Sequence, residues 1–486
     1  MSDEQTLQRF GYRQQLSRSL GYFSSFALSF SVICMTSGLF ADYGEGLRAG
    51  GPAFIWSWLI VGAGQFLVAM VFAQLARQIP LSGYAYQWTR SLAGDRLAFW
   101  AGWIMMVQFI TGMAGVAYAL ASYVVPFVGL SNSNRNVVFA TIATLVLAAL
   151  INHYGIKLAS LVNDVSVIAE ILGSVVIGVL LLGIALIRKT HPLTFLFTYP
   201  HQPSLGAYLQ AFLTASLMSV WTLGGFEAAA NVAEETHLPE TRVPTAILLS
   251  EVLAVAFGLL VLIGFTLAVP SVAVAAHDPT PLLYIVGSYF PKYVVVATLL
   301  LVSVAIFACV LANLTTVTRL IWAMARDGKV PASRFLSKVN HHKVPVTAIW
   351  VAIPITAVFT FWAQVEIVIM ALCTFAMYVT YGLVVGACLW GKRPAASPLT
   401  EQPRRVSPVL AATALAWIIG IIVLLSYMTA ISMSHRALVI SLSASALIAV
   451  CFILLLLARR RRHRNSILLS QLESPGLEEL DDRSMV

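Results

Sequence analysis

The chain has 486 residues, of which 59% are hydrophobic and only 10% are charged. This is far more apolar material than a soluble domain of that length buries, so the composition excludes a soluble protein and indicates an integral membrane protein. The formal net charge is +9, but the basic residues are spread over the chain with no soluble domain to present them, which disfavours nucleic-acid binding.

A helix needs about 20 apolar residues to cross a bilayer, and the sequence predicts an all-α protein with twelve such spans. Basic residues avoid short translocated loops, and with the N-terminus inside, 24 of the 30 Lys and Arg fall on the inner side. We therefore expect both termini, segments 1–19 and 459–486, to be cytoplasmic at a plasma or bacterial inner membrane, with the basic tail near lipid headgroups. The predicted spans are 20–42, 52–78, 97–128, 136–152, 158–187, 207–233, 244–269, 293–325, 345–363, 366–390, 407–430 and 436–458.

Two of these spans contain interruptions. Small polar residues and a glycine stand at Thr36, Ser37 and Gly38 in the first, and Gly224-Gly225 stands in the sixth. Broken backbone at membrane depth persists only beside protein or a water-filled cavity. If spans 1–5 and 6–10 form two halves, the breaks correspond, which is typical of the binding site of an inverted-repeat transporter. Either break alone also fits close helix packing.

The ends of the broken helices favour a small zwitterion. Free N–H groups near Gly38 and Leu39, at the start of the outer half-helix, suit a carboxylate, whereas free carbonyls suit an ammonium group or a small cation. Trp221 would offer an aromatic face to a cation or pack against lipid, and Phe226 is a weaker candidate. Glu227, inside a span, is a functional hypothesis by default: it would bind an amine, carry a proton or latch a gate, or merely cap a helix.

The fifth span contains Glu170, which would bind a proton or make a structural hydrogen bond. Asp164 lies nearer the inner end and is expected to be solvated. The histidines match no metal-ligand spacing, and no nucleotide- or dinucleotide-binding motif occurs in a suitable setting. The sequence therefore predicts no cofactor, metal or catalytic site, and any transport must be driven by gradients or exchange.

Four motifs carry a family resemblance. They are Gly50-Gly-Pro-Ala, Phe72-Ala-Gln-Leu-Ala-Arg-Gln-Ile-Pro-Leu-Ser-Gly-Tyr-Ala-Tyr-Gln-Trp88, Arg319-Leu-Ile-Trp-Ala-Met-Ala-Arg-Asp-Gly-Lys-Val-Pro331 and Val344-Pro-Val. With them, about residues 15–460 resemble the amino acid–polyamine–organocation superfamily of transporters, especially its amino acid, GABA and choline permease branch. The chain has Gln74 where the family usually has Glu, and Ser82 in place of a second glycine. It also lacks the coupling lysine that some relatives place on helix 5.

The resemblance implies a leucine-transporter-type fold. Two inverted repeats, 20–187 and 207–390, would be followed by two peripheral helices in 407–458. The substrate would bind between helices 1, 3, 6, 8 and 10, and transport would proceed by alternating access. Sodium-coupled members bind Na⁺ with paired hydroxyls on helix 8, which makes Thr315 and Thr316 a possible sodium site; threonines there also satisfy their own backbone. Some arginine/agmatine exchangers have a Glu six residues after a Trp, similar to Trp221 and Glu227.

These observations predict a permease for a small amino acid or amine: GABA-like, cationic or a polyamine. Proton-coupled uptake, exchange and sodium symport remain alternatives, and the oligomeric state stays open. A membrane sensor that binds an amino acid without net transport is a further alternative. An enzyme is disfavoured, because the buried polar residues are too few to supply an acid, a base and a nucleophile together.

Overall fold

The computed structural model describes residues 3–200, 202–361, 366–390 and 406–432. The chain divides into two compact units, Met1–Thr429 and Ala430–Val486, and nearly all of the described residues belong to the first. The predicted span 436–458 and the tail 459–486 lie outside the described residues. Within those residues every regular element is a helix, and β pairing is confined to one isolated bridge between Leu20 and Thr236.

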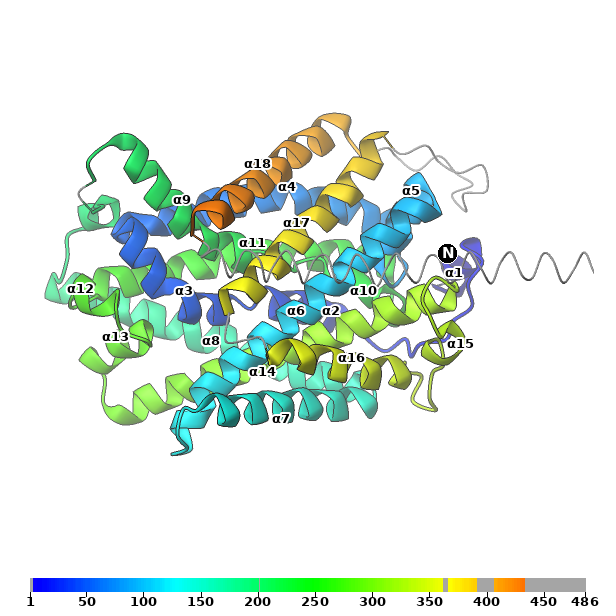
Figure 1. Ribbon diagram of the computed structural model, residues 1–486, viewed down its shortest axis with the longest axis horizontal. Helices are drawn as coiled ribbons and strands as arrows, with labels where there is room; N and C mark the ends of the chain where they lie inside the picture. Colours follow the sequence, from blue (N-terminus) through cyan, green and yellow to red (C-terminus); the bar gives the residue numbers. More distant parts are fainter. Residues whose placement is uncertain (1–2, 201, 362–365, 391–405, 433–486) are drawn as a thin grey trace, which may run out of the picture. The chain divides into compact units, whose positions relative to one another are not determined.

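The helices follow the predicted spans closely and add short elements between them (Figure 1). In chain order they are α1 (Asp3–Arg9), α2 (Tyr22–Ile33), α3 (Met35–Gly50), η1 (Pro52–Ile55), α4 (Trp56–Gln78), α5 (Tyr84–Ala93), α6 (Asp95–Phe127), α7 (Asn134–His153), α8 (Ile156–Arg188), η2 (Leu193–Phe197), α9 (Leu205–Thr222), α10 (Ala228–Asn231), η3 (Ala233–Glu235), α11 (Pro239–Ala268), α12 (Val272–Ala275), α13 (Pro281–Tyr289), α14 (Lys292–Arg326), α15 (Ser333–Leu336), α16 (Val346–Thr360), α17 (Glu366–Trp390) and α18 (Pro408–Ser432).

Nine helical stretches in the described part of the chain are long and apolar enough to cross a membrane. They match predicted spans 1 to 5, 7, 8, 10 and 11. The ninth predicted span is the shorter apolar helix α16, and the sixth is divided between α9, of 18 residues, and α10, of 4 residues. The all-helical membrane class is thus confirmed, whereas the full count of twelve and the inverted repeat stay predictions.

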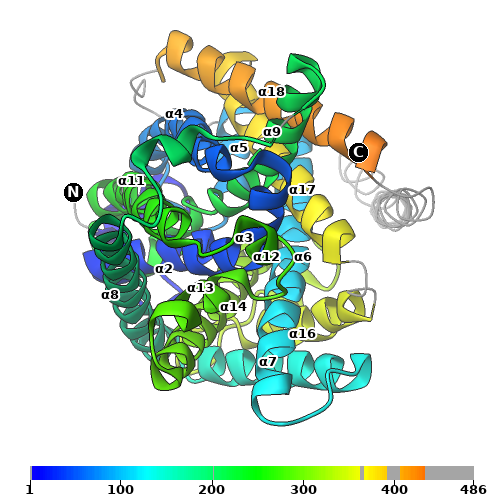
Figure 2. The ribbon, with the colours of Figure 1, turned by 90° about the vertical axis from the view of Figure 1, so that its left-hand side faces the viewer.

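The two halves of the first span, α2 and α3, run end to end through the middle of the first unit (Figures 1 and 2). Helix α2 packs against α8, α11 and α14, and α3 packs against α9. Close approach depends on small residues: a Cβ on Gly264 of α11 would overlap the backbone of Gly178 on α8. Membrane helices associate through such small-residue contacts because lipid gives them no hydrophobic driving force. This packing sets α2 among three unbroken helices and places α3 beside α9, part of the divided sixth span.

Candidate functional site

The first helix break lies at Cys34. This residue has the left-handed conformation φ 48°, ψ 54°, and it ends α2 and precedes α3. The sequence placed the interruption at Thr36, Ser37 and Gly38, but these residues already belong to α3. The Gly38 N–H donates to the Cys34 carbonyl at 3.1 Å, so the free N–H groups of the helix start belong to residues 35–37 and not to Gly38 and Leu39.

Gly38 has a packing role instead. A Cβ at this position would overlap the side chain of Thr222, the last residue of α9. Only glycine therefore lets the start of α3 approach the end of α9. The first break and the sixth span are in this way held side by side.

The second break lies where the sequence predicts it. Helix α9 ends at Thr222 and α10 begins at Ala228, leaving residues 223–227 outside both helices. Gly225 has φ +101°, a conformation that side chains rarely adopt. Its N–H donates to the hydroxyl of Tyr381 on α17 at 3.2 Å, which satisfies one backbone group that the break leaves free.

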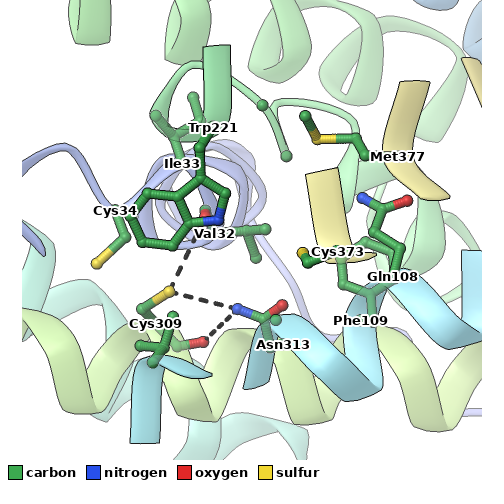
Figure 3. A pocket seen from close by; sticks show the side chains of 14 residues that line it. Val32, Ile33, Cys34, Gln108, Phe109, Trp221, Cys309, Asn313, Cys373 and Met377 are labelled. Atoms are coloured by element: carbon green, nitrogen blue, oxygen red, sulfur yellow. Dashed lines mark hydrogen bonds between the residues drawn. The ribbon is translucent and has the colours of Figure 1, made fainter. Parts of the chain in front are cut away.

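Both breaks open on one cavity of about 50 Å³ (Figure 3). Since one water needs about 10–15 Å³, this space is large enough for only a few water molecules, and an amino acid would enter only after the helices move apart. Its walls come from spans 1, 3, 6, 8 and 10, the five between which the resemblance places a substrate. The lining residues are Val32, Ile33, Cys34, Gln108, Phe109, Gly112, Val116, Trp221, Gly224, Gly225, Cys309, Asn313, Cys373 and Met377.

The lining is mostly apolar and rich in sulfur, with Gln108 and Asn313 as its polar side chains, and among the described residues it contains no acidic or basic side chain. The Asn313 amide donates to the carbonyl of Cys309 at 2.9 Å and lies 3.3 Å from its sulfur (Figure 3). The Cys309 thiol in turn points to the carbonyl of Val32, 3.9 Å away, just before the first break. Helix α14 is thereby tied to the backbone that the break exposes.

The predicted binding residues separate into two groups. Trp221, Gly224 and Gly225 line the cavity. Phe226 does not; it packs against Phe72 and Tyr381, with ring centroids 6.0 and 5.6 Å away. Besides Glu227, the remaining predicted residues are buried without lining the cavity: Thr36, Ser37, Gly38 and Leu39.

Glu227 is fully buried and faces tyrosines rather than the cavity. The Tyr84 hydroxyl donates to its Oε1 at 3.1 Å, and the Tyr381 hydroxyl donates to its Oε2 at 2.6 Å. Although Glu227 precedes α10, its side chain makes no capping hydrogen bond, so the helix-cap alternative fails. Gln108, which lines the cavity, interacts with the same carboxylate and connects it to the space where both breaks meet.

Glu170 occupies the place that the sequence assigned to a substrate carboxylate. Its Oε1 accepts a hydrogen bond from the Thr36 N–H at 3.1 Å, in the first turn of α3, where the helix dipole favours an anion. The fifth and first spans are thus joined at the break. Asp164, expected to be solvated, accepts a hydrogen bond from Ser24 at 2.6 Å.

The two threonines of the possible sodium site have other partners. Thr315 donates to Asn152 Oδ1 at 2.9 Å and approaches the carbonyl of Leu311, and Thr316 donates to the carbonyl of Ala312. Thr315 lines a second, smaller cavity of about 10 Å³, and Thr316 does not. The hydroxyls satisfy nearby acceptors, which is the alternative that the sequence left open.

Comparison with known proteins decides the family. The profile described as "Amino acid permease" matches residues 20–457, which is nearly the whole chain. The chain belongs to the amino acid permease family. Its members are transporters and not enzymes.

Several curated relatives resemble this permease over most of its length. It is 28% identical to the amino-acid permease BAT1 of Arabidopsis thaliana, over 87% of this chain and 88% of the relative. It is 27% identical to the branched-chain amino acid permease BcaP of Bacillus subtilis, over 69% and 73% of the two chains. It is also 25% identical to the methylthioribose transporter of B. subtilis, over 71% and 75%.

A cluster of ion pairs, here called the paired cluster, was missed by the sequence analysis. Glu235 receives two hydrogen bonds from Arg319, at 2.8 and 3.1 Å, and both side chains are fully buried. Glu234 receives two from Arg326, at 2.8 and 3.0 Å. Arg319 and Arg326 fall in a motif that the sequence analysis used only for the family resemblance. Their spacing of seven residues, two turns on one helix face, was the available signal.

The paired cluster extends to the last turn of α14. Asp327 accepts hydrogen bonds from Arg90 at 2.8 Å, from Tyr86 at 2.9 Å and from Tyr12 at 2.9 Å. Arg326 stacks on the Tyr12 ring, 3.8 Å from its centroid. The N-terminal segment, α5 and α14 are therefore fastened together at one end of the first unit, here called the α5 end.

Proposed function

We propose that this permease is a secondary transporter that moves a small amino acid across a cell membrane by alternating access. The observation that carries the proposal is that two broken helices open on one cavity. Discontinuous helices at the bilayer midplane hold substrate in transporters, because their free backbone groups replace water around a polar solute. The amino acid would bind where Cys34 and Gly225 interrupt the first and sixth spans.

The composition of the cavity supports a zwitterionic amino acid with an apolar or short side chain, a GABA-like one included. The lining has no acidic residue, and Glu227 already accepts two tyrosine hydroxyls. A cationic amino acid or a polyamine would require Glu227 to leave these tyrosines and turn to the cavity. Proteins with related sequences include a branched-chain amino acid permease, which fits a lining of this kind.

The proposal includes the topology expected from the sequence: twelve spans, inverted repeats 20–187 and 207–390, and the α5 end toward the cytoplasm. In the described form the paired cluster fastens the α5 end, and the cavity is too small for an amino acid. Transport would then require the ion pairs to separate when the cavity opens toward that side. Proton coupling and exchange are the energy sources we favour, since the hydroxyls of Thr315 and Thr316 have other partners.

Binding and transport are tested separately. A thermal-shift screen of the standard amino acids, 4-aminobutyrate and putrescine on the purified protein identifies the ligand, because binding raises the apparent stability by mass action. The stabilising compound is then radiolabelled and supplied to proteoliposomes preloaded with the same unlabelled compound. We expect counterflow accumulation. Binding without accumulation would indicate a sensor, and stabilisation by putrescine alone would overturn the amino acid assignment.

The thiols of the cavity allow the site to be located directly. Variants that keep one cysteine each at position 34, 309 or 373 report on the cavity, and a variant that keeps Cys388, which does not line it, is the matched control. We expect the ligand to slow N-ethylmaleimide labelling of the three cavity cysteines and to leave that of Cys388 unchanged. Equal protection at all four positions, or protection at Cys388 alone, would place the substrate elsewhere.

A further inference from the structure

Glu251 is a buried carboxyl that does not line the cavity between the helix breaks. It lies on α11, twelve residues after the helix begins, and is fully buried. In the described part of the chain neither of its carboxyl oxygens has a hydrogen-bond partner, and it forms no ion pair. The sequence analysis missed it, although a lone carboxyl inside an apolar span was a visible signal.

An unpaired carboxylate in such a place is costly. Transfer of an isolated charge into an apolar interior costs far more than transfer of a neutral group, and buried carboxylates are kept by cations or several donors. Glu235 has Arg319, and Glu227 has two tyrosine hydroxyls. Glu251 has neither, so the packing of this closed form fits the neutral carboxylic acid.

The position of Glu251 connects it to the second helix break. The Trp58 ring N–H of α4 donates to the Val255 carbonyl of α11 at 3.1 Å, and Gly62 of α4 also faces Val255. Extended by one turn along these antiparallel helices, the register of the two contacts predicts that Gln65 lies level with Glu251. The Gln65 amide donates to the carbonyl of Leu223, inside the break, at 2.7 Å, and its own carbonyl oxygen has no partner among the described residues.

Few ionisable groups lie close to Glu251. The charge that acts on it is that of Glu227, which precedes α10. Glu251 in turn acts on Tyr378 of α17, a neutral tyrosine whose hydroxyl donates to the Val220 carbonyl near the end of α9. Helices α4 and α2 carry only Arg77 and Tyr22, both at helix ends. The remaining groups on packed elements have other partners or lie toward the helix ends: Glu170, Asp164, Lys157 and Arg188 on α8, Asp42, Tyr43, Glu45 and Arg48 on α3, Glu234 and Glu235 on η3, and Tyr284 and Tyr289 on α13.

We propose that Glu251 binds the proton that this permease cotransports, and that its charge controls the hydrogen bond between Gln65 and Leu223 in the second break. The inference rests on the proposed transport function. The neutral acid leaves Gln65 bonded to Leu223 in the closed form. When the cycle lets water reach it, Glu251 releases one proton to that water, and the carboxylate draws the Gln65 amide away from the break. Repulsion between the two carboxylates opposes simultaneous ionisation of Glu251 and Glu227.

The test compares Glu251→Gln with the wild type in proteoliposomes, using the labelled amino acid that the thermal-shift screen identifies. Counterflow at equal pH measures substrate movement alone, and accumulation driven by an imposed acid-outside gradient measures coupling. We expect gradient-driven accumulation to fall about tenfold while counterflow stays within about twofold of the wild type. A tenfold loss lies within the usual range of coupling between two binding sites. Ser250→Ala, which removes only a local hydrogen bond to Ile247, is the control and should keep both activities.

An infrared measurement makes the inference independent of transport. The wild type at neutral pH should show the carbonyl band of a protonated, buried carboxylic acid, and Glu251→Gln should lose that band. Absence of the band, or unchanged gradient-driven accumulation in Glu251→Gln, overturns the inference. Failure of counterflow in the wild type would instead contradict the proposed function, while the band would still decide whether Glu251 holds a proton.

Discussion

The buried carboxyl groups of this permease occupy two different environments. At the α5 end Glu234, Glu235 and Asp327 each contact an arginine at 2.8 Å. Beside the helix breaks, Glu170 and Glu227 receive only neutral donors. Glu251, also beside the breaks, has no donor among the described residues.

The difference separates two tasks. A buried carboxylate that is paired with an arginine stays charged and keeps its partner, because removal of one member of the pair leaves the charge of the other buried and uncompensated. A carboxyl without a cation changes its charge at a smaller cost to the fold, and so responds to a proton or a substrate. We infer that the α5 end fastens the closed form, whereas the region of the breaks responds to what is transported.

The largest effect is expected at the fully buried pair of Glu235 and Arg319. Arg319→Met leaves the Glu235 carboxylate without its two hydrogen bonds, which should cost about 3–5 kcal/mol and lower the melting temperature in detergent strongly. The double variant Glu235→Leu with Arg319→Met removes both charges and should recover most of that loss. Equal melting temperatures for the wild type and the single variant would show that the pair does not fasten the closed form.

Glu227→Gln should affect transport more than stability. The substitution keeps the shape of the side chain but removes the charge that Tyr84 and Tyr381 face, and hydrogen bonds to a charged group contribute about 1.5–3 kcal/mol. We expect counterflow to fall about tenfold or more, with a melting temperature lowered less than that of Arg319→Met.

The control for Glu227→Gln is Glu45→Gln, the same chemical change at an exposed carboxylate paired with Arg48. Surface pairs of this kind contribute little, so both measurements should stay unchanged. If Glu227→Gln transports at the wild-type rate with an unchanged pH profile, Glu227 has no part in the mechanism.

Within the described residues, the sequence predicted the long apolar helices and the second break well because both depend on local composition. A long apolar run needs no partner to be recognised, and Gly224-Gly225 marks the second break through the backbone freedom of glycine. The first break was displaced by two to four residues. Its centre is Cys34, a residue type that carries no local signal for a left-handed conformation, and the nearby Gly38 instead serves contact with Thr222.

The partners of the charged residues could not be predicted from the sequence. Glu170 reaches Thr36 across 134 positions, and Glu235 reaches Arg319 across 84. Such pairs exist only after the helices pack, and no single-sequence pattern fixes which carboxylate meets which cation. Tertiary packing therefore decides which acidic residues are paired with an arginine and which can change their charge.

The smallest effects come from two matched tyrosines, one in each environment. Burial, together with the neighbouring Asp327 carboxylate, raises the pKa of Tyr12, so its hydroxyl stays a donor at neutral pH. Tyr12→Phe removes that donor, but Asp327 keeps Arg90 and Tyr86, and the Phe ring still supports Arg326. Tyr84→Phe removes one of the two hydroxyls that donate to Glu227, which has no arginine to replace it.

We therefore expect counterflow by Tyr12→Phe to stay within about twofold of the wild type, and that by Tyr84→Phe to fall about three- to tenfold, as for a lost hydrogen bond to a charged group. Both variants should keep a melting temperature close to that of the wild type. The opposite order would mean that the arginines do not buffer the α5 end against loss of a donor. In that case the carboxylates of the two environments would differ in position alone, and the division between fastening and responding groups would have to be abandoned.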